Sequence, residues 1–208
     1  MTALPSGPLV SPLRAALARA LAAPPTAVRV HWFRGARGAL RHDLPELFIS
    51  PAALVATLRQ VIAAPEPEKA RSAALLGAEL LAGTVRRQRS NIRSTTFLVV
   101  DHDALDGLTM GEAVQAFERL GLCAVLHPSP RWPSTSPPHE ARKWHALVFL
   151  APGTSPELVA SHGRLLAQAF NDALGCTLDG STLRPEAIAY VQPVDGPRGP
   201  EAVVLVEG

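Results

Sequence analysis

Residues 97–103, with the sequence FLVVDHD, decide the fold of this chain. The four apolar residues Phe97 to Val100 predict a short central strand that is buried on both faces. This strand runs directly into Asp101 and Asp103, and residues two positions apart on an extended segment point to the same face of a sheet. The sequence therefore places two carboxylates side by side at the end of a buried strand.

Alternating helix and strand signals follow this first strand. A Thr-x-x-Glu capping box at residues 109–112 opens a helix that Gly121 stops. A Ser-Pro pair at residues 155–156 opens a longer helix that Gly175 stops. Apolar runs predict further strands over residues 122–126, 144–150, 187–191 and 202–206. The order strand, helix, strand, strand, helix, strand is that of a ferredoxin-like, RRM-like βαββαβ sheet.

The first part of the chain predicts a smaller αβ unit. Helices are expected over residues 11–21 and from Ser50 onward, a strand over residues 27–33, and a helical or loosely structured stretch over residues 70–81. We therefore predict an α+β fold in which this N-terminal αβ unit packs on the RRM-like sheet. The expected division is an N-terminal subdomain of residues 1–83 and a catalytic subdomain of residues 84–208, which together form one compact domain.

The expected topology gathers polar side chains at one edge of the sheet. The strand that begins near Lys143 and His145 runs antiparallel to the first strand, so its beginning lies beside Asp101 and Asp103. The fourth strand flanks the first on its other side, and the turn before it brings Asp179 to the same edge. Three carboxylates, a histidine and a lysine are therefore expected to converge on one patch.

Such a patch suits hard divalent cations. Mg²⁺ and Mn²⁺ prefer oxygen ligands, and one or two carboxylates with substrate phosphates form their usual site. Two ions about 3.5–4 Å apart could stabilise the attacking and leaving oxygens of a phosphoryl transfer, with Lys143 and His145 facing the triphosphate. A structural interpretation also stays open, because Asp101, Asp103 and Asp179 occur in ordinary turn sequences and His145 could be a satisfied buried histidine.

Charge is distributed unevenly along the chain. Residues 1–100 carry thirteen Lys and Arg against five acidic residues, and residues 101–208 carry seven against thirteen, which gives net charges of +8 and −6. The segment 84–96, which lacks acidic residues, is either a phosphate-facing arm or a solvated polar loop. Trp132, in the Pro-rich loop of residues 127–142, could stack on a base or pack against the body. The basic residues of the arm are Arg86, Arg87, Arg89 and Arg93.

The composition excludes several classes of protein. Cys123 and Cys176 are far apart and in no paired motif, which excludes a disulfide framework and a zinc site built on several thiolates. No apolar run reaches the roughly 18–20 residues that a membrane span needs, and prolines interrupt the start where a signal peptide needs an apolar core. We expect a cytoplasmic protein with no zinc and no membrane partner.

Three motifs carry these residues: FLVVDHD with Asp101 and Asp103, KWHALVFL with His145, and LDGSTLRPEAIAYVQP with Asp179. Together they resemble the archaeo-eukaryotic primase superfamily, and within it the primase-polymerase domains of plasmid and phage replication proteins, over about residues 84–195. The resemblance implies that the three aspartates hold two Mg²⁺ or Mn²⁺ ions and that His145 contacts the phosphates of the incoming nucleotide. Lys143 departs from the family, which commonly has a small residue there, but it adds a phosphate-binding cation.

The resemblance implies a DNA primase or primase-polymerase that transfers NTPs or dNTPs onto a nascent primer on a single-stranded DNA template. The arginine arm would bind this template, Arg184 is a further nucleotide- or template-binding candidate, and a helicase domain or protein is a further candidate partner. The alternative is a non-catalytic single-stranded-DNA or origin-binding domain of a replication initiator. A rolling-circle nickase is disfavoured, because the chain has no His-x-His motif and its only tyrosine, Tyr190, lies in an expected apolar strand.

Overall fold

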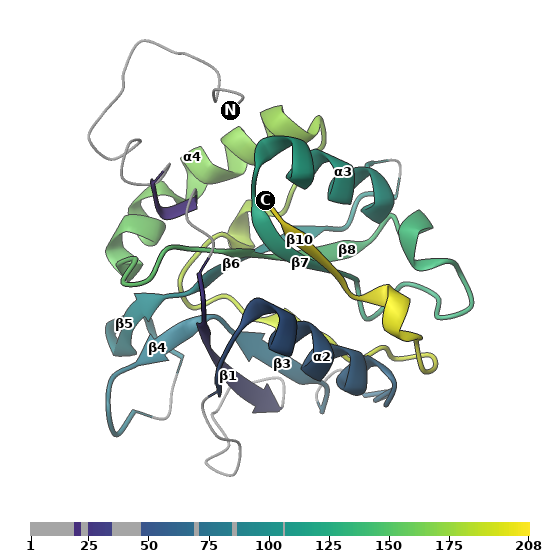
Figure 1. Cartoon of the computed structure of the whole chain (residues 1–208), viewed down its shortest axis with the longest axis horizontal. Coiled ribbons are helices and arrows are strands. Elements are labelled where there is room, and N and C mark those ends of the chain that lie inside the picture. Colours follow the sequence, from purple (N-terminus) through teal and green to yellow (C-terminus); the bar gives the residue numbers. More distant parts are fainter. Residues whose placement is uncertain (1–18, 22–24, 35–46, 69–70, 85–86, 106) are drawn as a thin grey trace.

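The computed structural model describes residues 19–21, 25–34, 47–68, 71–84, 87–105 and 107–208 (Figure 1). Most of the helix expected over residues 11–21 lies outside these ranges, and residues 19–21 are helical. The described elements alternate between strands and helices along the chain, and the strands of each sheet pair antiparallel. The predicted α+β class is confirmed.

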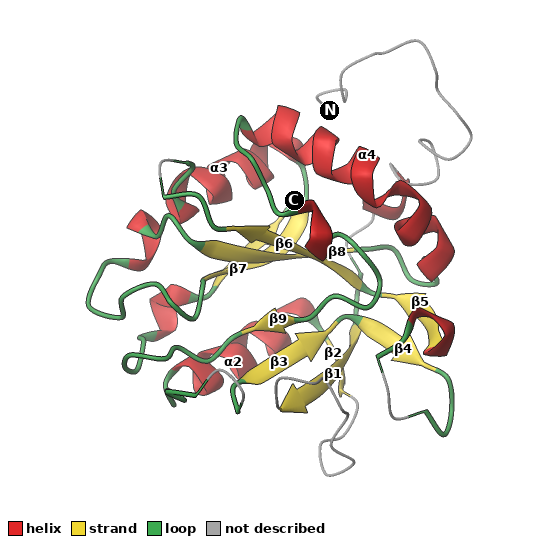
Figure 2. Ribbon diagram, turned by 180° about the vertical axis from the view of Figure 1, so that it is seen from behind, coloured by secondary structure: helices red, strands yellow, loops and turns green. Residues whose placement is uncertain are grey.

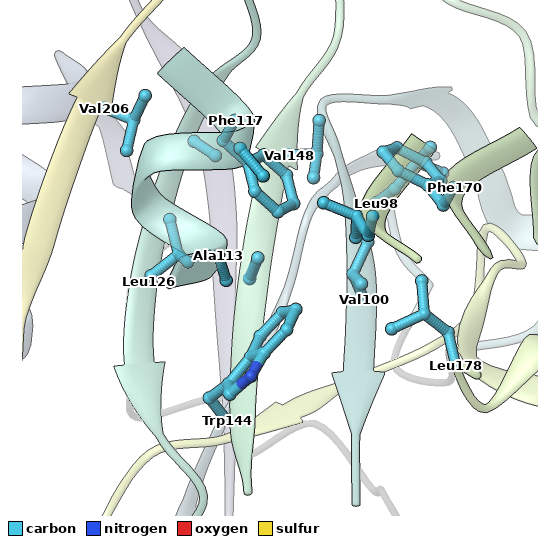
Figure 3. Close-up of a cluster of buried hydrophobic side chains, with 14 of the residues drawn as sticks. Leu98, Val100, Ala113, Phe117, Leu126, Trp144, Val148, Phe170, Leu178 and Val206 are labelled. Carbon is cyan, nitrogen blue, oxygen red and sulfur yellow. The ribbon is translucent and has the colours of Figure 1, made fainter. Parts of the chain in front are cut away.

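The main sheet has four strands in the order β10-β7-β8-β6. Its members are β6 (Phe97–His102), β7 (Cys123–Pro128), β8 (Trp144–Phe149) and β10 (Val204–Glu207). Two helices, α3 (Met110–Leu120) and α4 (Pro156–Leu174), cover one face of it (Figures 1 and 2). Between helices and sheet lies a core that includes Phe117, Trp144 and Phe170 (Figure 3).

A second layer covers the other face of the main sheet. Its strands run in the order β2-β1-β3-β9: β1 (Val28–Arg34), β2 (Leu47–Ile49), β3 (Ala73–Leu76) and β9 (Ala189–Tyr190). Helix α2 (Pro51–Ile62) belongs to this layer, and a second apolar core joins it to the main sheet. A two-stranded sheet pairs β4 (Ala78–Leu80) with β5 (Ile92–Thr95).

Capping residues start the helices where the sequence predicts. Ser50, Thr109 and Ser155 each accept a hydrogen bond from a backbone N–H in the first turn of α2, α3 and α4. Gly121 and Gly175 end α3 and α4 with φ values of 65° and 66°, a left-handed conformation that glycine adopts without steric cost. Short 3₁₀ turns lie at Arg89–Asn91 (η1), Pro138–Glu140 (η2), Gly180–Thr182 (η3) and Pro200–Ala202 (η4).

The helical or loosely structured stretch expected over residues 70–81 is wrong. This segment forms β3 and β4, and all four residues of β3 are buried. β3 pairs with β1, so its register places Leu75 opposite Trp32 in the second core. Tertiary packing therefore overrides the helical propensity of an Ala- and Leu-rich run.

The sequence analysis also predicts the wrong partner for the strand expected over residues 187–191, which it places beside the first strand of the main sheet. The segment that contains β9 pairs with β3 in the second layer and not with β6. Its apolar residues Ala187, Ala189 and Val191 are buried in the second core, which explains this placement. The main sheet therefore keeps the order of the first three strands of a ferredoxin-like unit, and β10 extends it on the opposite edge beside β7.

Hydrogen bonds connect the two parts of the chain on either side of residues 83 and 84. The β4–β5 ladder crosses this expected boundary, and β9 joins a sheet of the N-terminal part.

None of the helices within the described ranges is long and apolar enough to cross a membrane.

Candidate active site

Asp101 and His145 form a cross-strand pair near the end of β6. They are register partners, and the distance from His145 Nε2 to Asp101 Oδ1 is 3.2 Å. Strand alternation puts both on the face of Phe97 and Val99, which belong to the core shared with the second layer. The His145 side chain is 9% exposed, and its Nδ1 lies 3.2 Å from the carbonyl oxygen of Tyr190 in β9.

The carbonyl oxygen of Tyr190 fixes one ring nitrogen of His145. A carbonyl oxygen only accepts hydrogen bonds, so Nδ1 carries a proton toward Tyr190. The other ring nitrogen, Nε2, lies beside the carboxylate of Asp101.

A second acid–base pair lies just beyond the ends of the two strands. Lys143 Nζ is 3.2 Å from Asp103 Oδ1, and the Asp103 side chain is 65% exposed. The backbone of Lys143 is fixed because its carbonyl oxygen accepts a hydrogen bond from Ser129 N. The structure thus places Asp101 beside His145 and Asp103 beside Lys143, and convergence of all four on one metal and phosphate site stays a prediction.

Asp179 reaches the same strand through its backbone. Its N–H donates to the carbonyl oxygen of Asp101 at 3.0 Å, so the turn arrives at β6 although the strand after it does not. Its exposed carboxylate accepts hydrogen bonds from the N–H and the hydroxyl of Ser181, both at 2.8 Å. Among the residues that the structure describes, no group of three or more His, Cys, Asp or Glu side chains is close enough to hold a metal ion.

Asp101 and Asp103 still supply the kind of ligand that a hard divalent cation prefers. Mg²⁺ usually takes one or two carboxylates from a protein when phosphates complete its shell. A metal site formed by Asp101, Asp103 and Asp179 stays a prediction.

A third side chain, His127 of β7, continues the row formed by Asp101 and His145. His127 is the register partner of His145 on its other side, and their ring centroids lie 5.2 Å apart at an interplanar angle of 86°. Burial and, next, the charge of His145 lower the pKa of His127 from 6.5 to about 3. The sequence prediction missed this residue, although the alternation Cys123, Val125, His127 would have placed it on this face.

We expect His127 to make the free energy of unfolding depend on pH below about 6.5. The unfolded chain takes up a proton near pH 6.5, whereas the folded chain keeps His127 neutral until about pH 3. Between these values stability falls as the pH falls, by up to about 1.4 kcal/mol per pH unit. Urea unfolding of the parent chain and of His127→Asn at pH 7.5 and 4.5 measures this contribution.

The Asn variant lacks this proton uptake, so its stability deficit should shrink by about 2–3 kcal/mol at pH 4.5. Arg198 also lowers the pKa of His127 and Asp101 raises it, and both charges are present in either protein. Equal deficits at the two pH values would contradict the assignment of a neutral His127.

The arginines of the expected DNA-binding arm differ in how they are held. Arg86 lies outside the described residues. Arg87 Nη1 donates to the carbonyl oxygen of Glu186 at 2.8 Å, and Arg93 Nη1 forms an ion pair with Glu79 at 3.3 Å. Arg89, in η1, and Arg184 are exposed. DNA binding by this arm stays a prediction.

Trp132 is half-buried in the Pro-rich loop, where its side chain packs against the first core. It also lines a cavity of about 240 Å³ together with Ser134 and Arg198. The Arg198 side chain is buried and donates to the carbonyl oxygens of Pro128, Ser129 and Trp132. Base stacking on Trp132 therefore stays a prediction, and contact with the protein body is what the structure shows.

Comparisons with known proteins give one structural neighbour. No family model matches the chain, and no curated protein matches it by sequence. Among solved structures, the chain is similar to the polymerase domain of Mycobacterium tuberculosis Ligase D in complex with DNA, with 12% sequence identity and a TM-score of 0.37. The match covers 86% of this chain and 71% of that one.

Proposed function

We propose that this protein is a nucleotidyltransferase that extends a primer on single-stranded DNA, as a primase or primase-polymerase. The observation that carries the proposal is the pairing of Asp101 with His145 and of Asp103 with Lys143 where β6 ends and β8 begins. Two carboxylates that can hold a hard cation beside two basic side chains that can hold phosphates are the groups that a triphosphate needs. The sequence motifs around these residues resemble those of the archaeo-eukaryotic primases.

In the proposed reaction, a 3′-hydroxyl oxygen attacks the α-phosphorus of a nucleoside triphosphate. One phosphorus–oxygen bond forms, the bond to the β-phosphate breaks, the hydroxyl proton passes to solvent, and pyrophosphate leaves. Mg²⁺ or Mn²⁺, held by Asp101, Asp103 and the expected third ligand Asp179, would neutralise phosphate charge when bound. Catalysis by the chain itself consists of positioning and charge stabilisation.

The two basic side chains of the site have different roles in this proposal. His145 is nearly buried, and its ring lies between Tyr190 and Asp101, so it offers a ring nitrogen in a set place. Lys143 is 29% exposed and its partner Asp103 is well exposed, so this ion pair is weak and the side chain can turn toward a phosphate. Arg184 and the exposed Arg89 are further candidates for contacts with phosphates.

The proposal is tested by synthesis on defined single-stranded DNA templates with Mg²⁺ or Mn²⁺ and either NTPs or dNTPs. We expect product whose composition follows the template: a dT template directs incorporation of adenine nucleotides and a dA template does not. Joint replacement Asp101→Ala and Asp103→Ala should abolish product. Product that does not depend on the template, or that survives in the joint variant, would contradict the proposal.

A non-catalytic single-stranded-DNA-binding domain is the second candidate. It is favoured by the carboxylate of Asp179, which caps η3 through Ser181 instead of facing Asp101 and Asp103. Removal of acidic residues from such a domain should leave DNA binding unchanged or strengthen it. Binding of single strands by the parent chain without any synthesis would support this candidate over the enzyme.

A further inference from the structure

His127 lies in the middle of the main sheet and contacts His145 of the candidate active site. It is fully buried, whereas its cross-strand neighbour His145 reaches the site. The two rings meet edge to face, with centroids 5.2 Å apart. Replacing His127 would therefore change the surroundings of His145 without removing a group that substrate could touch.

The hydrogen bonds of His127 fix its tautomer. Its Nδ1 lies 3.0 Å from the carbonyl oxygen of Pro128, which can only accept, so the proton is on Nδ1. Arg198 Nη1 donates to the same oxygen at 3.2 Å, and the two donors use its two lone pairs. Nε2 of His127 is then an unprotonated acceptor, and it is buried without a hydrogen-bond partner among the described residues.

Burial and a nearby cation keep the His127 ring neutral. The guanidinium of Arg198 shares Pro128 with it on one side, and the ring of His145 lies against it on the other. A proton on Nε2 of His127 would place a positive charge in a fully buried environment near the guanidinium, which is unfavourable.

We propose that His127 is a positioning residue that holds the His145 ring edge to face, with Nε2 of His145 beside Asp101 and available to substrate phosphates. This inference rests on the proposed nucleotidyl transfer. A phenyl ring at position 127 would fill a similar volume but would lose the bond to Pro128 and the neutral acceptor beside His145. An asparagine could keep a donor to Pro128.

The chain offers a matched control in His102 of β6. It is also fully buried, its Nδ1 lies 2.8 Å from a carbonyl oxygen, that of Arg142, and its Nε2 is a buried atom without a hydrogen-bond partner in the described part of the chain. Its ring stacks on Trp144, on the opposite face of the sheet. His102→Phe therefore reproduces the loss of a buried histidine without a change at His145.

Calorimetry measures how tightly dATP binds, in the presence of Mg²⁺, to four proteins: the parent chain, His127→Phe, His145→Ala and the double variant. We expect His127→Phe to weaken binding about tenfold, and to have no further effect once His145 is alanine. His127→Asn should recover most of the loss, and His102→Phe should bind like the parent chain. Effects that add in the double variant, or equal losses in both Phe variants, would overturn the inference.

A second measurement separates this inference from the proposed function. The ¹⁵N signals of the His145 ring report the surroundings of its two nitrogens, and His127→Phe should shift them while His102→Phe leaves them in place. If the parent chain binds no dATP, the proposed function fails, and the ring signals still decide whether His127 positions His145. Unchanged His145 signals in His127→Phe would overturn the inference.

Discussion

Replacement of Asp103 by asparagine is expected to lower the rate of template-dependent synthesis by about 10³-fold, because it removes a charge that holds the cation in the proposed site. The same change should cost little stability, since the Asp103 side chain is 65% exposed and its pair with Lys143 is a surface ion pair. Primer extension under single-turnover conditions measures the rate. Urea unfolding measures the stability of the same samples.

Asp172→Asn is the matched control for this prediction. Asp172 is an exposed aspartate on α4, where it accepts a hydrogen bond from Gln168, and α4 covers the face of the main sheet opposite the site. It should leave the rate within about twofold of the parent chain, a change of well under 1 kcal/mol in the barrier. An Asp103→Asn variant that keeps its fold and its full rate would remove Asp103 from the proposed metal site.

Replacement of Trp144 by alanine is expected to reduce the free energy of unfolding by about 3–5 kcal/mol, the usual cost of a large-to-small change in a core. The indole is fully buried and stacks on His102, with ring centroids 5.0 Å apart. It meets Phe117 edge to face at 6.4 Å (Figure 3). Its Nε1–H donates to the carbonyl oxygen of Leu108 at 2.8 Å. The midpoint of urea unfolding, with its slope held constant, reports the loss.

Trp132→Ala provides the comparison for a tryptophan outside the sheet. Trp132 is only partly buried in the Pro-rich loop, so its replacement should cost less than that of Trp144. Equal losses of unfolding free energy in the two variants would contradict the prediction that burial in the core makes Trp144 the more stabilising residue. Single-strand affinity of Trp132→Ala also reports whether this side chain stacks on bases.

Local sequence signals predict a large part of the observed fold. The helix caps at Ser50, Thr109 and Ser155 and the stops at Gly121 and Gly175 depend on a few neighbouring residues, so one sequence is enough to find them. The apolar run Phe97 to Val100 likewise identifies a strand buried on both faces.

The candidate site is predictable to the extent that it depends on two adjacent strands. Once β6 and β8 are antiparallel neighbours, the period of two along each strand places Asp101 opposite His145 and Asp103 near Lys143. The role of His127 is not visible in the same way. Its place beside His145 depends on which strand lies on the outer side of β8, and that is a property of the whole sheet.

The sequence alone therefore determines the α+β class, the helix ends and the place of Asp101 and Asp103 beside the beginning of β8, because each depends on local hydrogen bonds or on one strand pairing. Only the tertiary structure decides that residues 73–76 form a strand and that β9 pairs with β3 instead of β6. These segments are short and apolar, so they satisfy several partners equally well in isolation. Burial of Leu75, Ala189 and Val191 in the core between the two layers selects the partner of each segment. This burial depends on residues far away in the sequence, so no local pattern reveals it.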